Sequence, residues 1–155
     1  MNTITAQEAS ELTKKLQNEG KTVVVTNGCF DILHVGHVRY LQKTKTYADV
    51  LIVLLNSDVS VKKIKGEDRP INNESDRAEI LKALSCVDYV VLFDEASPAE
   101  ILRIIKPNVY TKGADYNLET LPEAEILKEV GIKAVFIDFV DNKSTTNLIN
   151  KIKHN

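Results

Sequence analysis

Residues 22–37 read TVVVTNGCFDILHVGH, and this stretch decides the fold. Its first five residues are β-branched, which is typical of a strand, and the residues from Gly36 onward are compatible with a helix. A short turn lies between these parts. His34 and His37 are three residues apart, so they point to one side of the helix start. The stretch therefore predicts a strand, a tight turn and a helix N-terminus that carries two imidazoles.

Such a helix N-terminus suits a polyphosphate. The first backbone N–H groups of a helix lack intrahelical partners, the helix dipole places partial positive charge there, and a neutral imidazole can donate a hydrogen bond. Gly28 and Gly36 would let a phosphate approach backbone that a side chain would otherwise screen. The stretch therefore indicates a nucleotide site.

Length and composition are typical of one globular domain. The chain has 155 residues, of which 43% are hydrophobic and 27% charged, and its net charge is −2. This length can bury a substantial core, and the composition gives no case for disorder. A weakly acidic chain lacks a general basic surface for nucleic acid or anionic membrane. We expect a single domain over residues 1–155, with an N-terminal helix in 1–20 and the core in 21–153.

Cysteine usage and hydropathy predict a cytoplasmic protein. Cys29 and Cys86 are far apart and show no Cys-x-x-Cys spacing, so neither a disulfide framework nor a cysteine zinc site is indicated, and we assign both to packing. The N-terminus lacks a basic segment followed by an apolar run. The longest apolar run, residues 50–55, is too short to span a bilayer.

Strand and helix patterns alternate along the chain. Strands are expected at 22–26, 50–55, 89–93, 108–111 and 133–139. Helices are expected at 5–20, 36–47, 73–85, 97–107, 120–131 and from 144 onward, and the starts at 5, 97 and 120 have capping-box spacing. Residues 56–72 are polar and irregular and predict a functional loop. The predicted fold class is α/β: a Rossmann-like, doubly wound, mainly parallel five-stranded sheet flanked by helices.

Ligands of such sheets bind at the carboxyl ends of the strands. Those ends are expected at 26–37, 56–58, 112–116 and 141–146, where most of the unusual polar residues lie. Several of them also have ordinary interpretations. Ser144 and Thr145 could simply cap a helix, Asp31 could be a turn residue, and Lys65 could belong to a solvated loop. Arg77 lies near a predicted helix start, where the dipole does not stabilise a cation, so a phosphate or carboxylate partner is expected.

The pattern Gly-x-Phe-Asp-x-x-His-x-Gly-His at 28–37 resembles the signature of the HxGH nucleotidyltransferase superfamily, which includes class I aminoacyl-tRNA synthetases and small cytidylyltransferases. The resemblance extends over about residues 21–153 to Asn-Ser-Asp at 56–58, Lys-Gly at 65–66, Arg-Pro at 69–70, Asp-Arg at 76–77, Lys-Gly-x-Asp-Tyr at 112–116 and Ser-Thr-Thr at 144–146. Together these motifs are similar to the adenylyltransferases that act on D-glycero-β-D-manno-heptose 1-phosphate.

This resemblance implies transfer of AMP from ATP to the sugar 1-phosphate, which gives ADP-heptose and pyrophosphate for bacterial surface glycan or lipopolysaccharide synthesis. It also implies Mg²⁺ as the ion that accompanies ATP, and a homodimer. Such domains often follow a sugar kinase in one chain. Here too few residues precede the motif for a kinase, so we expect the stand-alone form.

The resemblance also implies the roles of individual residues. The expected catalytic residues are His34, His37, Lys65 and Arg77. The expected nucleotide-binding residues are Asn27, Gly28, Phe30, Asp31, His34, Gly36, His37, Lys112, Ser144 and Thr145. The expected substrate-binding residues are Asn56, Asp58, Arg69, Asp115 and Tyr116. Asp31 is in addition the candidate Mg²⁺ ligand.

Other functions stay open at the level of sequence. Glycerol-3-phosphate cytidylyltransferases carry Arg-Thr-x-Gly-Ile before Ser-Thr-Thr, whereas residues 140–143 here read VDNK. The departure counts against CTP as donor, and Lys143 is a candidate for the missing arginine. The alternatives are a cytidylyltransferase for glycerol 3-phosphate or another polyol or sugar phosphate, a non-catalytic nucleotide-binding regulatory protein, and a small redox or metal protein. No P-loop or dinucleotide-binding motif is present.

Overall fold

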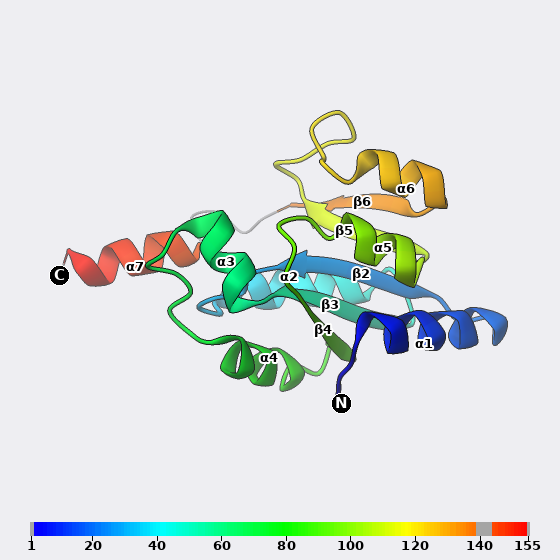
Figure 1. Ribbon diagram of the computed structural model, residues 1–155, viewed down its shortest axis with the longest axis horizontal. Coiled ribbons are helices and arrows are strands. Elements are labelled where there is room, and N and C mark those ends of the chain that lie inside the picture. The colour runs from blue at the N-terminus through cyan, green and yellow to red at the C-terminus, as the bar shows by residue number, and fades with distance from the viewer. Residues whose placement is uncertain (1, 139–143, 155) are drawn as a thin grey trace.

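The structure is a computed structural model that describes residues 2–138 and 144–154 (Figure 1). Its centre is a parallel sheet in which the described strands have the order β1-β4-β3-β2-β5-β6. The strands are β1 (Asn2–Thr3), β2 (Val23–Gly28), β3 (Val50–Asn56), β4 (Tyr89–Phe93), β5 (Val109–Gly113) and β6 (Lys133–Ile137). The helices are α1 (Ala6–Asn18), α2 (Val35–Lys45), α3 (Asp58–Lys65), α4 (Glu74–Lys82), α5 (Ala99–Ile105), α6 (Ala124–Val130) and α7 (Thr145–Lys153).

The predicted Rossmann-like α/β fold is confirmed. All five predicted strands form, and β2, β3, β4, β5 and β6 make up the body of the sheet. β1, which adds an edge strand beside β4, was not predicted, because its two residues are too few to show an alternating pattern. Phe139, the last residue of the predicted final strand, lies outside the described residues.

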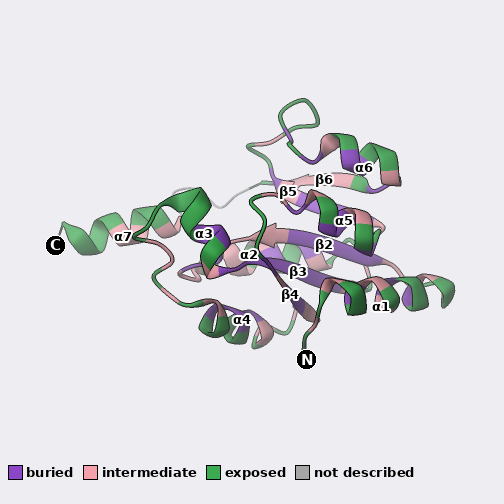
Figure 2. Cartoon of the chain, viewed as in Figure 1, coloured by how far each residue is buried: buried purple, intermediate pink, exposed green. Residues whose placement is uncertain are grey.

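Alternating side chains of the central strands enter two separate cores. Val23 and Val25 pack with α1, α5 and α6 on one face, whereas Val24 packs with α2 and α4 on the other. β3 behaves in the same way: Ile52 belongs to the first core and Leu51 to the second. Figure 2 shows these strands as the most buried part of the molecule. A sheet covered on both faces keeps its carboxyl edge open for a ligand.

The helix starts follow the sequence only in part. Thr5 forms the predicted capping box with Glu8. The boxes predicted at Ser97 and Thr120 are wrong: α5 begins after Pro98 and α6 after Glu123, and neither N-cap residue makes a side-chain capping bond in the described chain. The Ser97 hydroxyl still accepts a hydrogen bond from the Ala99 N–H at 3.3 Å. Thr120 instead bonds with Asn117. A capping-box pattern permits a helix start, but the hydroxyl can bond with other residues instead, as Thr120 does with Asn117.

The segment 56–72 contains a helix that was predicted as loop. Ser57 caps α3, since its hydroxyl accepts a hydrogen bond from the Ser60 N–H at 3.2 Å. Ser60 and Val61 are buried, Asp58 is partly buried, and the other residues of the helix are exposed. The lysine-rich composition of these residues hid a short amphipathic helix. Its last residue is Lys65, which the helix carries to the carboxyl edge of the sheet.

The described helices include none that is long and apolar enough to cross a membrane. α7 leaves the body of the molecule at the end where the carboxyl edges of the strands lie (Figure 1). Its described residues include none that is fully buried.

Candidate nucleotidyl-transfer site

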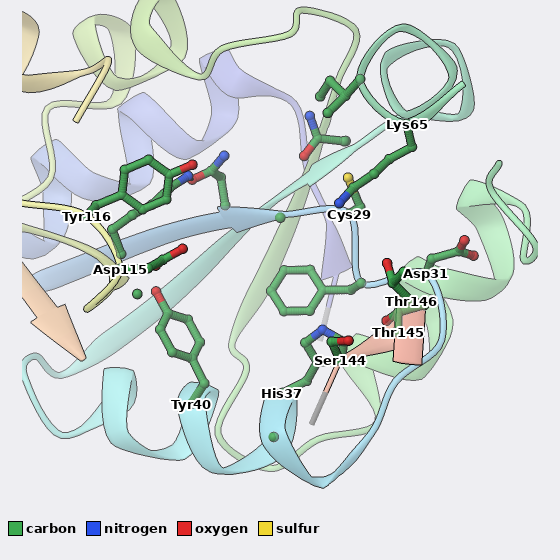
Figure 3. Close-up of a pocket in the computed structure, with 18 of the residues that line it drawn as sticks. Cys29, Asp31, His37, Tyr40, Lys65, Asp115, Tyr116, Ser144, Thr145 and Thr146 are labelled. Carbon is green, nitrogen blue, oxygen red and sulfur yellow. The ribbon is translucent and has the colours of Figure 1, made fainter. Parts of the chain in front are cut away.

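A cavity of about 830 Å³ opens at the carboxyl edge of the sheet (Figure 3). It is bounded by the turn after β2, the first turn of α2, the end of α3, the segments after β4 and β5, and the starts of α6 and α7. The predicted site residues that line it are Asn27, Gly28, Phe30, Asp31, His34, Gly36, His37, Asn56, Lys65, Arg69, Lys112, Asp115, Tyr116, Ser144 and Thr145. Asp58 and Arg77 are not among the lining residues of the described chain.

The turn between β2 and α2 is shaped by close packing. Phe30 has a positive φ of 44°, a conformation that side-chain-bearing residues rarely adopt, and its ring lies over Gly28. A Cβ at Gly28 would stand 2.8 Å from that ring, so a larger residue does not fit there. The sequence suggested that Gly28 leaves room for a phosphate, but on this side the room is taken by Phe30. The Phe30 ring in turn packs against His37, with 5.2 Å between the ring centroids.

The two histidines form one stacked unit. Their ring centroids are 3.8 Å apart and the rings are 26° from parallel. Nδ1 of His34 accepts a hydrogen bond from the Gly36 N–H at 3.0 Å, and Nδ1 of His37 accepts one from the His34 N–H at 3.3 Å. Because each Nδ1 is an acceptor, we infer that Nε2 carries a proton in both rings. The backbone N–H groups of His34 and Gly36 thereby orient both rings.

The stacked pair also fixes the charge of His37. Burial, and then repulsion from the His34 ring, lower the pKa of His37 to about 4. At neutral pH the ring is therefore uncharged. It can give a hydrogen bond to an anion while remaining neutral itself, next to the N-terminal N–H groups of an eleven-residue helix.

Asp31 ties a second loop to this turn. Its carboxylate, 2% exposed, accepts hydrogen bonds from Arg69 Nε at 2.6 Å and from the Ile71 and Asn72 N–H groups at 2.9 Å. Asn72 Nδ2 also donates to the Asp31 carbonyl at 2.9 Å. Burial alone would raise the pKa of Asp31, but the two backbone donors and Arg69 bring it below its ordinary value.

These contacts do not fit the predicted role of Asp31 as a Mg²⁺ ligand. Mg²⁺ needs free carboxylate oxygens in a near-octahedral shell, and the oxygens of Asp31 already accept three N–H donors. Within residues 2–138 and 144–154, no cluster of three or more His, Cys, Asp or Glu side chains could hold a metal ion. The contacts instead make Asp31 the anchor of Arg69, which lines the cavity.

Arg77 joins three segments beneath the cavity. Its side chain is fully buried; Nη1 donates to the carbonyls of Cys29 and Asn56 at 2.7 and 2.8 Å, and Nη2 donates to Asp58 Oδ1 at 2.8 Å. Nε donates to the carbonyl of Asn72 at 2.9 Å. The partner expected from the sequence is therefore a carboxylate. Direct contact of Arg77 with phosphate, and of Asp58 with the acceptor, does not fit this placement.

The end of β5 supplies a polar wall. Lys112 Nζ and the Tyr110 hydroxyl both donate to Asn27 Oδ1, at 3.0 and 2.6 Å. The Lys112 ammonium also lies 5.3 Å from the centre of the Tyr116 ring. Burial lowers the pKa of Lys112, and attraction to Glu123 and Asp115 opposes that shift.

The end of α3, with Lys65, and the start of α7 line another part of the cavity. The side chain of Lys65 extends toward Cys29 (Figure 3), and burial raises the pKa of that thiol. Ser144 caps α7 by accepting a hydrogen bond from the Asn147 N–H at 3.0 Å, and Thr145 Oγ1 donates to the Ile32 carbonyl at 3.1 Å. The start of α7 is thus attached to the β2–α2 turn. Lys143 lies outside the described residues.

Sequence reasoning missed part of the lining. Cys29, Gly113 and Thr146 lie within the expected strand ends but had no assigned role in the site. The lining residues outside those ranges are Tyr40, Ile64, Ala96, Ser97, Pro122, Glu123 and Asn147. Ala96 and Ser97 follow β4, whose carboxyl end the strand-end argument left out although the same rule applies to it. Glu123 was assigned to a capping box. Tyr40, whose hydroxyl lies 2.9 Å from Thr26 Oγ1 and 3.2 Å from Thr111 Oγ1, had no signal beyond its place on a helix.

The sequence of the chain matches a known protein family and several known proteins. Residues 25–151 match the cytidylyltransferase-like family. The chain is 53% identical over 151 residues to the bifunctional protein HldE of Aliarcobacter butzleri, a match that covers 97% of this chain and 31% of that protein. It is 53% identical over 139 residues to the bifunctional protein HldE of Campylobacter fetus subsp. fetus, covering 90% of this chain and 30% of that protein. This chain therefore spans less than a third of the length of these relatives.

One solved structure resembles this fold closely. The crystal structure of the lipopolysaccharide core biosynthesis protein from Thermoplasma volcanium GSS1 superposes with a TM-score of 0.63 at 30% identity, over 80% of this chain and 100% of that one. The family match includes the β2–α2 turn with its two histidines and the start of α7. The chain belongs to the cytidylyltransferase-like family of nucleotidyltransferases.

Proposed function

We propose that the chain is an adenylyltransferase that transfers AMP from ATP to D-glycero-β-D-manno-heptose 1-phosphate. A phosphate oxygen of the sugar attacks the α-phosphorus of ATP, the bond from that phosphorus to the bridging α,β-oxygen breaks, and pyrophosphate leaves. The product is ADP-heptose. The attacking phosphate is already anionic at neutral pH, so the reaction needs no general base, and its barrier lies in bringing anions together in line.

The stacked histidine pair, in which His37 is neutral, is the observation that carries the proposal. In it, His37 donates from Nε2 to the α-phosphate and His34 donates toward the β-phosphate, beside the N–H groups of the first turn of α2. These donors are fixed before substrate arrives, so they lose little freedom as charge develops in the transition state. The resemblance to heptose 1-phosphate adenylyltransferases and the identity to HldE proteins support the choice of donor and acceptor.

Positive charge for the phosphates comes from Lys65 and Arg69. Arg69 uses Nε to hold Asp31, so its outer nitrogens can bind a phosphate in a two-pronged manner. Arg77 has a positioning role, because it holds the carbonyls of Cys29 and Asn56 in place from below. Mg²⁺ belongs to the proposal as the ion bound to the phosphates of ATP, with no ligand from Asp31.

Two wider expectations belong to the same proposal. A homodimer is expected from the family resemblance, and size-exclusion chromatography with light scattering would give twice the chain mass of 17.3 kDa. A cytoplasmic location and small-molecule substrates rather than nucleic acid fit an ATP-dependent enzyme with a net charge of −2.

A matrix of donors and acceptors tests the proposal. ATP and CTP are each combined with D-glycero-β-D-manno-heptose 1-phosphate and with glycerol 3-phosphate, and pyrophosphate release is measured. We expect turnover with ATP and the heptose phosphate. Turnover only with CTP and glycerol 3-phosphate would identify the protein as a cytidylyltransferase instead. Binding of ATP without release of pyrophosphate from any pair would identify it as a nucleotide-binding protein.

A further inference from the structure

Glu123 places a buried carboxylate in the wall of the cavity. The residue is 3% exposed and stands at the N-cap position of α6, next to Pro122, which also lines the cavity. One oxygen, Oε1, accepts a hydrogen bond from the Ser97 hydroxyl at 3.3 Å. The other oxygen, Oε2, is buried and has no hydrogen-bond partner within residues 2–138 and 144–154.

A structural role accounts for only part of this arrangement. A carboxylate at the start of a helix is favoured by the helix dipole, but Glu123 makes no capping hydrogen bond to α6 in the described chain. Lys112 attracts Glu123, yet the Lys112 ammonium is directed to Asn27 Oδ1. Buried carboxylate oxygens are nearly always hydrogen-bonded, since leaving one unpaired is unfavourable. An oxygen left over in the wall of a cavity therefore suits a donor from a bound ligand.

The chemistry of a carboxylate selects the donor. A carboxylate oxygen accepts hydrogen bonds and finds no donor on a phosphate oxygen, so its partner is another donor of the substrate, and hydroxyls are the donors that both proposed substrates carry. Ser97 and Glu123 lie where α5 and α6 begin, and these helices pack on the opposite face of the sheet from α2. The cavity therefore has a phosphate side at the histidines and an acidic side at Glu123.

We propose that Glu123, oriented by Ser97, is a specificity residue that binds a hydroxyl of a substrate, either on the ribose of the nucleotide or on the sugar acceptor. The inference rests on the proposed function, since that reaction supplies both hydroxyl-bearing groups. A hydrogen bond to a charged group is worth about 10- to 100-fold in affinity, so loss of the carboxylate should change one Michaelis constant by that factor.

Glu123→Gln tests this directly, because the side chain keeps its size and loses its charge. Glu125→Gln is the matched control, since Glu125 lies on the exposed first turn of the same helix. The Michaelis constants for ATP and for D-glycero-β-D-manno-heptose 1-phosphate are measured for both variants and the wild type. Thermal unfolding of each variant confirms the fold. In parallel, wild-type binding of ATP is compared with that of 2′,3′-dideoxy-ATP, a readout that needs no variant.

The outcomes separate the two hydroxyl sources and the two proposals. A 10- to 100-fold rise in KM for the heptose phosphate alone assigns Glu123 to the sugar. A rise in KM for ATP alone assigns Glu123 to the ribose, provided that the wild type binds dideoxy-ATP more weakly than ATP and that this difference in affinity disappears in Glu123→Gln. Michaelis constants equal to those of Glu125→Gln, with equal wild-type affinity for ATP and dideoxy-ATP, overturn the inference. Absence of wild-type turnover contradicts the proposed function, and the dideoxy comparison then decides the ribose assignment.

Discussion

At the scale of single residues, His37 carries most of the proposed chemistry. Its Nδ1 is held by the backbone of His34, its ring packs against Phe30 and His34, and its pKa of about 4 keeps it neutral under physiological conditions. A donor whose tautomer and orientation are fixed in this way stabilises charge on a phosphate without first reorganising.

Replacing His37 by alanine should therefore lower kcat by about 100- to 1000-fold, which is the usual effect of removing one preorganised donor. Pyrophosphate release under saturating substrates measures the change. His154→Ala is the matched control, because His154 lies at the end of α7 among exposed residues and should leave kcat unchanged. A folded His37→Ala protein with near-wild-type kcat would contradict the role of this ring.

Arg77 should affect stability more than substrate contact. Arg77→Met removes the four hydrogen bonds that the buried guanidinium makes in the described chain and takes their donor from Asp58 and three carbonyls, so we expect a loss of about 3–5 kcal/mol in the free energy of unfolding. Urea denaturation measures it. Arg103→Met, at an exposed arginine paired with Glu100 and Glu129, should change stability little. An Arg77→Met protein as stable as wild type would refute the structural role.

At the scale of elements, the loop 66–72 depends on Asp31. In Asp31→Asn the neutral amide no longer pairs with Arg69 and accepts fewer backbone hydrogen bonds. Hydrogen exchange should therefore speed up at the Ile71 and Asn72 N–H groups, and KM for the phosphorylated acceptor should rise.

Asp49→Asn is the control for this exchange experiment, because the Asp49 carboxylate accepts from the Thr22 N–H and hydroxyl, before the start of β3. Its exchange pattern at 71 and 72 should be that of the wild type. The Mg²⁺ concentration that gives half-maximal rate should be the same in Asp31→Asn and wild type. A large shift in that concentration, with unchanged exchange, would show that Asp31 binds the metal.

Elements with a strong local pattern could be predicted from the sequence. The run of β-branched residues, the turn and the two histidines define β2 and the start of α2, and the terminal helix begins at Ser144 as expected. α3 could not be predicted from the sequence, because only two of its residues are buried and its lysines leave no clear helical spacing of apolar residues. The predicted boxes do not form at α5 and α6, where Ser97 bonds with Glu123 across the chain and Thr120 bonds with Asn117, contacts that the capping-box spacing does not reveal.

The same distinction applies to the site. Strand ends and motif residues gave most of the cavity lining, since parallel strands bring their carboxyl ends to one edge. The burial of individual motif side chains could not be predicted from the sequence. An arginine or aspartate in a motif can either contact the ligand or bind the backbone of the loops that line the site. Arg77 and Asp31 both hold backbone, which only the fold decides.

At the scale of the whole molecule, the neutral state of His37 links stability to pH. Its pKa falls from an ordinary 6.5 to about 4 on folding, so between these values the unfolded chain binds more protons than the native one. The contribution of His37 to the free energy of unfolding is therefore fully present above pH 6.5 and is lost as the pH falls toward 4. Between pH 7 and 5 the loss should be about 2 kcal/mol in the free energy of unfolding.

Urea denaturation at pH 7, 6 and 5 measures this dependence. In His37→Gln the titrating ring is absent, so its stability should change less over the same range. NMR titration of the His37 ring checks the cause, with an expected pKa near 4. A curve for His37→Gln as steep as that of the wild type would show that other groups produce the effect.

In the proposed function the two sides of the cavity act together in adenylyl transfer: a phosphate side at α2 and α7 and a substrate side at β4, β5 and α6. Phosphorus NMR of wild-type protein with ATP, Mg²⁺ and D-glycero-β-D-manno-heptose 1-phosphate tests it most directly, because every phosphate of substrates and products has its own signal. We expect the ATP and sugar-phosphate signals to decline together while pyrophosphate and the ADP-heptose diphosphate appear in equal amounts. Conversion of ATP to ADP and inorganic phosphate, or an unchanged spectrum, would contradict the proposed function.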